Sequence, residues 1–329
     1  MTAKWNWALT WLLFGVLALG GSGAAQSNAA NSDFEHDLVL ANSGDTAAQL
    51  RVGLAFNQGL VTQCSYPEAM RWFEAAADSG STEAQAWVGS MYLLGHGVAK
   101  DLTKAFEIES KLAPKNATAA TFLGLMYMSG DGVAKDATAA ANLFRQAQEA
   151  GNPRGMELLG VLYQRGEGVP QDATIAEYFY SRAAALGDNW AELHLGDLYW
   201  KGTLGERNYA AAFDNFTQAA QQGNFAAQQR LGRMYEQGKG VPQDYSRALQ
   251  FYKLAAQSSY ATAELSLAGM YAHGRGVPKD IVTAYAWTLL AAQHHDSSAP
   301  ARLEKLQSAM SADEVQRATA MANSGLAKQ

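Results

Sequence analysis

The chain has 329 residues, of which 48% are hydrophobic and 17% charged, and its formal net charge is −6. This negative balance argues against nucleic acid as the main partner, because surfaces that bind nucleic acid have an excess of Lys and Arg. Cys64 is the only cysteine, which excludes a disulfide within the chain. We expect it to be a tolerated loop residue, with pairing to another chain as the alternative.

Residues 1–25 have the pattern of a secretory signal peptide. A single Lys precedes an apolar run over residues 5–21, and Gly23 and Ala25 stand in the small-residue positions of a cleavage site. We predict cleavage after Ala25 and a secreted or periplasmic protein. The alternative is an uncleaved membrane anchor, because the apolar run is close to the shortest length that spans a bilayer. Residues 26–45 are polar, and we expect them to lack regular structure.

A repeat dominates the rest of the chain. The segments LGVLYQRGEGVPQD (159–172) and LGRMYEQGKGVPQD (231–244) are nearly identical, and similar segments occur in the other copies. One glycine recurs seven times at a spacing of 35 or 36 residues. Its positions are Gly59, Gly95, Gly130, Gly166, Gly202, Gly238 and Gly274. A fixed period of this length predicts a solenoid of stacked repeats.

Each copy predicts two helices joined by a glycine turn. With Ala227 of the sixth copy as position 1, the apolar residues of the first helix fall at positions 1, 5, 8 and 9, which is a helical stripe. Position 6 is Gly232, and a glycine inside a helix costs about 1 kcal/mol relative to Ala. We therefore expect a neighbouring helix to approach closely there. Gly238 ends the first helix, and Gly240 permits a left-handed turn.

The second helix of each copy begins after a residue that can cap it. An aspartate side chain accepts hydrogen bonds from the free N–H groups of a helix start. The predicted caps are Asp101, Asp136, Asp172, Asp244 and Asp280, with Asn208 and Ser65 in the fifth and first copies. Apolar and aromatic residues follow each cap. One helix pair cannot bury both of its apolar faces alone, so neighbouring pairs must stack.

The pattern A-x-x-x-L-G-x-[ML]-Y-x-x-G-x-G-V-x-x-D, with the 36-residue period, resembles Sel-1-like repeats, which are relatives of the tetratricopeptide class. The resemblance covers residues 46–295. It implies an all-α fold, a right-handed α/α solenoid of about seven 36-residue helix-turn-helix repeats. Three departures stand out: GLVTQCSYP in the first copy, GTLGERN in the fifth, and Pro114, which should end the second helix of the second copy early. Residues 296–329 are predicted to form a helical cap, with a capping box at Ser311 and Glu314.

In repeats of this kind the first helices line the concave surface, which is an implication of the resemblance. Opposite the packing stripe, at 100° per residue, lie positions 3, 7 and 10. The candidate partner-binding residues at these positions are Leu93, Leu125, Met128, Asp197, Trp200, Arg233 and Glu236. For Trp200 the alternative is that it fills a gap left by the GTLGERN turn, and the two interpretations have equal weight. For the three apolar residues packing is the favoured alternative, because solenoid helices have few free faces.

No catalytic motif, metal site or cofactor site is predicted. The chain has no H-E-x-x-H, C-x-x-C or G-x-S-x-G sequence, and no Lys has a Ser three residues before it, as penicillin-recognising enzymes require. The adjacent His294 and His295 are expected to be solvated, because neighbouring side chains on a helix diverge. These observations predict an exported scaffold that binds a protein or peptide in envelope assembly or regulation, rather than an enzyme. Carbohydrate or peptidoglycan binding is the alternative function.

Overall fold

The computed structural model describes residues 23–58, 64–324 and 326, and in this part of the chain every regular element is a helix. The chain forms two compact units, of which the first ends at Ala191 and the second begins at Glu192, inside helix α11. Most of the predicted signal peptide (residues 1–22) lies outside the described residues. No helix among the described residues is long and apolar enough to cross a membrane.

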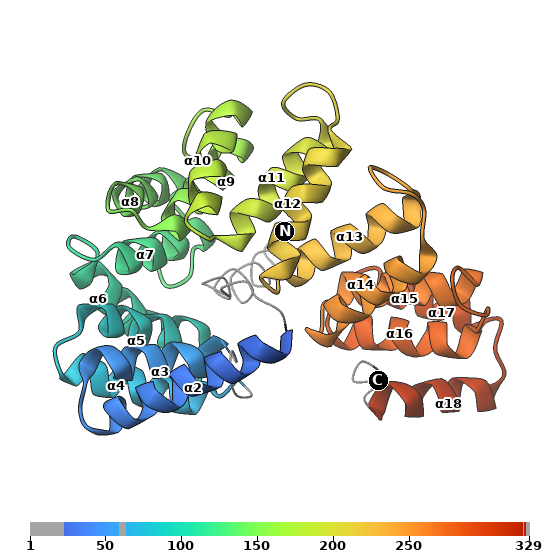
Figure 1. The fold of residues 1–329 in the computed structure, drawn as a ribbon, viewed down its shortest axis with the longest axis horizontal. Coiled ribbons are helices and arrows are strands. Elements are labelled where there is room, and N and C mark those ends of the chain that lie inside the picture. The colour runs from blue at the N-terminus through green and yellow to red at the C-terminus, as the bar shows by residue number, and fades with distance from the viewer. Residues whose placement is uncertain (1–22, 59–63, 325, 327–329) are drawn as a thin grey trace. The chain divides into compact units, whose positions relative to one another are not determined.

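The helices alternate along the chain as first and second helices of the predicted repeats. The first helices are α3 (Thr46–Gln58), α5 (Thr82–Leu94), α7 (Ala117–Ser129), α9 (Pro153–Arg165), α11 (Asn189–Lys201), α13 (Phe225–Gln237) and α15 (Ala261–His273). The second helices are α4 (Tyr66–Asp78), α6 (Leu102–Leu112), α8 (Ala137–Glu149), α10 (Ala173–Ala185), α12 (Tyr209–Gln221), α14 (Tyr245–Gln257) and α16 (Ile281–Gln293). Consecutive helices pack on one another from α3 to α10 in unit 1 and from α12 to α16 in unit 2 (Figure 1). The predicted α/α solenoid is confirmed.

Caps fix where the second helices begin. Each of the five predicted aspartates and Asn208 accepts a hydrogen bond from a backbone N–H in the first turn of its helix. Ser65 is the exception, because its side chain makes no capping bond and Pro67 occupies the first turn of α4. The expectation for Ser65 is therefore wrong, while the other predicted caps are confirmed.

Position 6 is a glycine because an aromatic side chain of the second helix lies against it. A Cβ atom on Gly232 would lie 2.6 Å from the ring of Tyr252, which is closer than carbon atoms approach. The same arrangement recurs in Gly53–Phe73, Gly124–Phe144, Gly160–Tyr180 and Gly196–Phe216. In the second copy the residue against Gly89 is not aromatic but the carboxylic acid Glu109. The predicted close approach is confirmed in these six copies, and in the seventh copy position 6 is Ala268.

The second glycine of the G-x-G turns permits contact with the preceding repeat. Gly240 has a φ of 76°, and a Cβ atom there would lie 2.8 Å from the backbone oxygen of Tyr209, the first residue of α12. A side chain at this place would therefore push neighbouring repeats of unit 2 apart. The predicted early end of the second helix in the second copy is also observed, because α6 ends at Leu112, two residues before Pro114.

The polar N-terminal segment is helical, which corrects the expectation of no regular structure over residues 26–45. Helix α2 (Gly23–Asn42) packs against α3. Its buried residues Phe34 and Ala41 lie in one apolar cluster with Val52 and Trp72, and the rings of Phe34 and Phe56 meet edge to face at 5.6 Å. These few apolar residues at helical spacing are sufficient to dock the segment, although the composition is polar.

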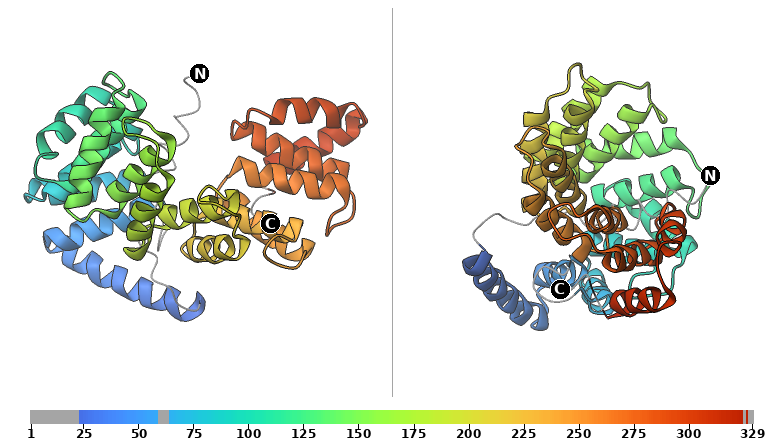
Figure 2. Two further views of the ribbon diagram at one scale, coloured as in Figure 1. Left: turned by 90° about the horizontal axis from the view of Figure 1, so that it is seen from above. Right: turned by 90° about the vertical axis from the view of Figure 1, so that its right-hand side faces the viewer.

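Helices α17 (Ala299–Gln307) and α18 (Ala312–Asn323) both pack against α16 (Figure 2). The capping box at the start of α18 is present: the backbone N–H of Glu314 donates to Oγ of Ser311 at 3.3 Å, and the backbone N–H of Ser311 donates to Oε2 of Glu314 at 2.8 Å. Ala299, Ala318 and Ala322 are buried. The last helices therefore cover apolar surface of the seventh repeat.

Candidate interaction surface

Three of the predicted partner-binding residues lie in unit 1 and are buried. Leu93, Leu125 and Met128 each have at most 1% of their surface exposed. Leu125 and Met128 belong to the largest apolar cluster described in unit 1, and Leu93 packs with Met126. The expectation that these residues contact a partner is corrected, because side chains packed in this way offer no surface. Packing, the alternative that the sequence favoured, explains them.

The remaining four residues lie in unit 2, where the carboxylate of Asp197 on α11 is held by Arg230 on α13. Nε of Arg230 lies 2.9 Å from Oδ1 of Asp197, and the two side chains are 26% and 13% exposed. Burial alone would raise the pKa of Asp197, but the charge and hydrogen bond of Arg230 outweigh it, and the pKa lies below its usual value. Arg230 also donates to Oε1 of Gln229 at 3.0 Å. Asp197 therefore joins two first helices.

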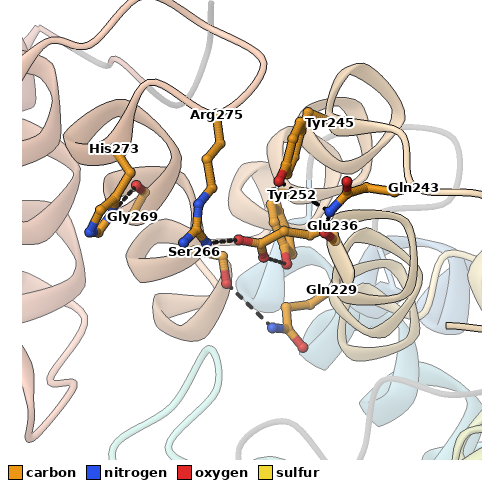
Figure 3. A network of polar contacts seen from close by, with 9 residues as sticks. All are labelled: Gln229, Glu236, Gln243, Tyr245, Tyr252, Ser266, Gly269, His273 and Arg275. Carbon is orange, nitrogen blue, oxygen red and sulfur yellow. Dashed lines mark hydrogen bonds and ion pairs between the residues drawn. The ribbon is translucent and has the colours of Figure 1, made fainter. Parts of the chain in front are cut away.

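The carboxylate of Glu236 on α13 is held in the same way. Oη of Tyr252 donates to its Oε2 at 2.7 Å, and Nη1 of Arg275 lies 2.8 Å from its Oε1 (Figure 3). Burial, and next to it the Glu236 charge, raises the pKa of Tyr252, so the hydroxyl stays protonated and donates. Gln229 extends the network to Ser266 on α15 at 3.4 Å (Figure 3). The polar network therefore runs over α11, α13 and α15.

The tyrosine hydroxyl has a counterpart in unit 1. Tyr180, at the same place on α10, donates to Oε1 of Gln164 at 2.8 Å, and Gln164 occupies position 10 of its repeat, as Glu236 does. In α8 the residue at this place is Phe144, and position 10 of that copy is the buried Met128. In the two pairs that have a tyrosine in this packing position, its hydroxyl thus holds a polar residue of the first helix.

Trp200 lies among cations and a second aromatic ring. Its ring meets that of Tyr209 edge to face, with centroids 5.0 Å apart. Cζ of Arg233 lies 5.6 Å from the Trp200 centroid, and Nζ of Lys239 lies 5.3 Å from it and 5.9 Å from that of Tyr209. We call these four residues the cation–aromatic cluster. Within the described part of the chain neither cation of the cluster has a carboxylate within 4.0 Å.

The Sel1 repeat model matches seven segments of the chain. They are residues 46–81, 82–108, 117–152, 153–188, 191–224, 225–260 and 261–296. The chain belongs to the Sel1 repeat family. Proteins of this family are generally protein-interaction scaffolds, and their helical fold is typically non-catalytic. The second match ends at Ile108, one residue before the unusual Glu109.

Solved structures of the family are similar to this chain. A Sel1 repeat protein from Oxalobacter formigenes is 29% identical over 92% of this chain and 85% of that one, with a TM-score of 0.58. The protective antigen c5321 of uropathogenic Escherichia coli is 31% identical over 87% of this chain and 69% of that one, with a TM-score of 0.38. Immunity protein Pa5087 from Pseudomonas aeruginosa shares the fold at 21% identity, over 64% of this chain and 81% of that one, with a TM-score of 0.50. A comparison with curated proteins found no match.

Sequence reasoning used helix positions alone and therefore missed Tyr209 and Lys239. Lys239 is the middle residue of the G-x-G turn after α13, and it reaches the first residue of the preceding second helix. Arg275, at the same place in the next turn, reaches α13. In unit 1 His96 stacks on Tyr66 at a centroid distance of 3.8 Å. The variable residue between two recurring Sel1 glycines was a signal for this surface.

The histidines near the end of the repeats do not form a solvated pair. Nδ1 of His294, the residue directly after α16, lies 2.9 Å from Oε1 of the buried Glu264 on α15. Burial raises the pKa of Glu264, and the contact with His294 opposes this rise. His295 is exposed. Among the described residues no cluster of three or more His, Cys, Asp and Glu could hold a metal ion.

Proposed function

We propose that the chain is an exported scaffold that holds a protein or peptide segment against one surface of unit 2. This surface is formed by α11 and α13 around Asp197, Trp200, Arg233 and Glu236, and we call it the first-helix surface of unit 2. Membership of the Sel1 repeat family supports the general role. The cation–aromatic cluster is the observation that supports the place, because it combines a tryptophan with an exposed arginine. Trp and Arg are over-represented among the residues that supply most of the binding energy in protein interfaces.

The first-helix surface also has the rigidity that an interface needs. Asp197, Arg230 and Glu236 are held by contacts between helices of unit 2, so the surface beside Trp200 is ordered before a partner arrives. A preorganised surface loses less conformational entropy on binding. The alternative of carbohydrate binding has less support, because proteins of the Sel1 repeat family typically bind proteins.

Trp200→Ala tests the binding role against gap filling. If Trp200 lies in the interface, its replacement by Ala should weaken binding by about 2 kcal/mol, roughly thirtyfold in affinity. A tryptophan that only fills a gap should instead lower the free energy of unfolding by about 3–5 kcal/mol. Melting temperature and affinity for a purified envelope partner are measured side by side. Tyr178→Ala, which removes an exposed aromatic residue in unit 1, is the matched control. A large loss of stability with unchanged binding per folded molecule would reject the proposed surface.

The export part of the proposal rests on residues 1–25 and has a separate test. If the signal peptide is cleaved after Ala25, N-terminal sequencing of the exported protein should begin at Gln26. The host envelope is the expected compartment, with envelope assembly or an envelope enzyme as the process served. An intact Met1 on a membrane-bound form would instead favour the anchor.

A further inference from the structure

The charges on the first-helix surface of unit 2 do not balance. Its two carboxylates are already engaged, Asp197 by Arg230 and Glu236 by Arg275. Arg233 and Lys239 have no such partner among the described residues, although the whole chain has a net charge of −6. The sequence placed the carboxylates of Asp197 and Glu236 among the candidate partner-binding groups beside Trp200. The structure shows instead that its acceptors are occupied and that free donors remain.

The two free cations keep their hydrogen-bonding capacity. A cation–π contact uses the electrostatic field of the ring and leaves N–H groups available to other acceptors. The exposed Arg233 can bind a carboxylate through two parallel hydrogen bonds. Lys239, at the middle of a glycine turn, adds a second positive charge near the same ring. Trp200 and Tyr209 supply apolar area between the cations.

We propose that the cation–aromatic cluster recognises an acidic peptide segment in which Asp or Glu residues stand beside an apolar or aromatic side chain. This inference rests on the proposed function, because it names the chemistry of the partner at the same surface. Carboxylates complement the two unpaired cations, and the apolar side chain covers Trp200 and Tyr209. Nucleic acid fits less well, because phosphate-backbone binding uses many more cations than the two that are free here.

Selection from a displayed library of random 12-residue peptides on the purified protein tests this inference. Asp and Glu should be enriched over their library frequency, next to Leu or an aromatic residue. A synthetic peptide from the enriched set should bind about tenfold more weakly to the Arg233→Gln/Lys239→Gln variant, which corresponds to loss of roughly 1.4 kcal/mol. Its affinity should also fall as the NaCl concentration rises.

Two variants separate loss of contact from loss of fold. Lys253→Gln removes an exposed positive charge on α14 and should leave peptide affinity unchanged. Arg233→Lys/Lys239→Arg keeps both charges and should retain most of the affinity. Melting temperatures of all variants should agree, because the replaced side chains are exposed or half-buried.

The other outcomes overturn different claims. Enriched peptides without an acidic bias, or acidic peptides whose affinity is the same in the double variant, would overturn the acidic-peptide inference and leave a binding surface. Displacement of bound peptide by soluble peptidoglycan fragments, without acidic enrichment, would assign the surface to the cell wall. Absence of any enriched peptide would count against the proposed function itself.

Discussion

The helix pairs α5–α6 and α13–α14 occupy the same place in two copies of the repeat but fill it differently. In α13–α14 the ring of Tyr252 lies against Gly232, and its hydroxyl donates to Glu236. In α5–α6 the fully buried side chain of Glu109 lies against Gly89, and neither of its carboxyl oxygens has a hydrogen-bond partner among the described residues. A packed and hydrogen-bonded tyrosine therefore fills this position in α13–α14. In α5–α6 the same position holds a buried carboxylic acid without a hydrogen-bond partner among the described residues.

The comparison shows that the residue in this packing position also influences the surface of the first helix. The tyrosine hydroxyl reaches position 10, where it fixes a polar side chain of the first helix. A buried carboxyl cannot do this, and position 10 of its copy is the buried Leu93. Burial, with a smaller contribution from the Glu83 charge, raises the pKa of Glu109 well above its usual value.

The largest expected effect is the difference between the two pairs when a methyl group is added to the glycine of each. Gly232→Ala should lower the free energy of unfolding by about 2–3 kcal/mol, because the new Cβ meets the Tyr252 ring and the Ala248 backbone oxygen. Gly89→Ala should cost less than about 1 kcal/mol, because the end of the Glu109 side chain can move and Ala favours the helix.

Gly269→Ala is the matched control for these substitutions, because a Cβ atom there meets nothing within 4 Å. It should stabilise α15 slightly, by less than about 1 kcal/mol. Urea unfolding of the three variants gives the comparison. Equal losses in Gly232→Ala and Gly89→Ala would mean that the two pairs pack equally tightly.

Next in size is the removal of the buried acid. The folded-state pKa of Glu109 is raised, so the folded protein is most stable when this acid is protonated. That stability is fully present below the unfolded-state pKa near 4.5 and is lost as pH rises through the folded-state pKa. Glu109→Gln should therefore be more stable than the wild type by about 2 kcal/mol at pH 8, with a smaller difference at pH 4. The measurement is urea unfolding at several pH values. Glu107→Gln, on the exposed face of the same helix, should show no such difference.

The ion pair of unit 2 should give a pH dependence of opposite sign and smaller size. The folded-state pKa of Asp197 is lowered, so its contribution is present above the unfolded-state value near 3.8 and is lost as pH falls through the folded-state value. A double-mutant cycle of Asp197→Asn and Arg230→Gln should give a coupling energy of about 1 kcal/mol at pH 7. Its loss at low pH is expected, and a coupling that persists in acid would contradict the ion-pair account.

The more exposed pair of Glu236 and Arg275 is the control for that cycle. Its side chains are 20% and 47% exposed, so solvent screens the interaction more strongly. We expect a coupling energy of about 0.5 kcal/mol, reduced further by added salt. A larger coupling here than at Asp197 would reverse the ranking that burial predicts.

The period and the caps were predictable because each is a local property that recurs in every copy. Ser65 makes no capping bond, whereas Asn152, which is also followed by a proline in the first turn, caps its helix. Helix α2 was missed because the polar composition hid the stripe that includes Phe34 and Ala41. The apolar half of the predicted surface was wrong for a physical reason. Positions 7 and 10 face away from the packing stripe of one isolated helix, but the neighbouring repeats of unit 1 cover Leu125 and Met128.

The cation–aromatic cluster was half predictable. Trp200 and Arg233 stand at helix positions that the period defines, whereas Lys239 and Tyr209 reach the cluster through the turn geometry that two glycines permit. The engagement of Glu236 depended on a hydroxyl from another helix and on an arginine from the next turn. Spacing within one helix holds no information on either contact.

Reversal of one charge tests the central claim most directly, namely that the first-helix surface of unit 2 holds an acidic peptide. Lys239→Glu should weaken binding of an acidic peptide by more than about tenfold. The same variant should bind a peptide with Lys in place of one acidic residue better than the wild type does. Fluorescence anisotropy with the two peptides and the two proteins gives the four affinities. We predict that the Lys239→Glu variant recovers affinity when it is paired with the Lys-containing peptide. Equal affinities of the wild type and the variant for the acidic peptide would contradict the account.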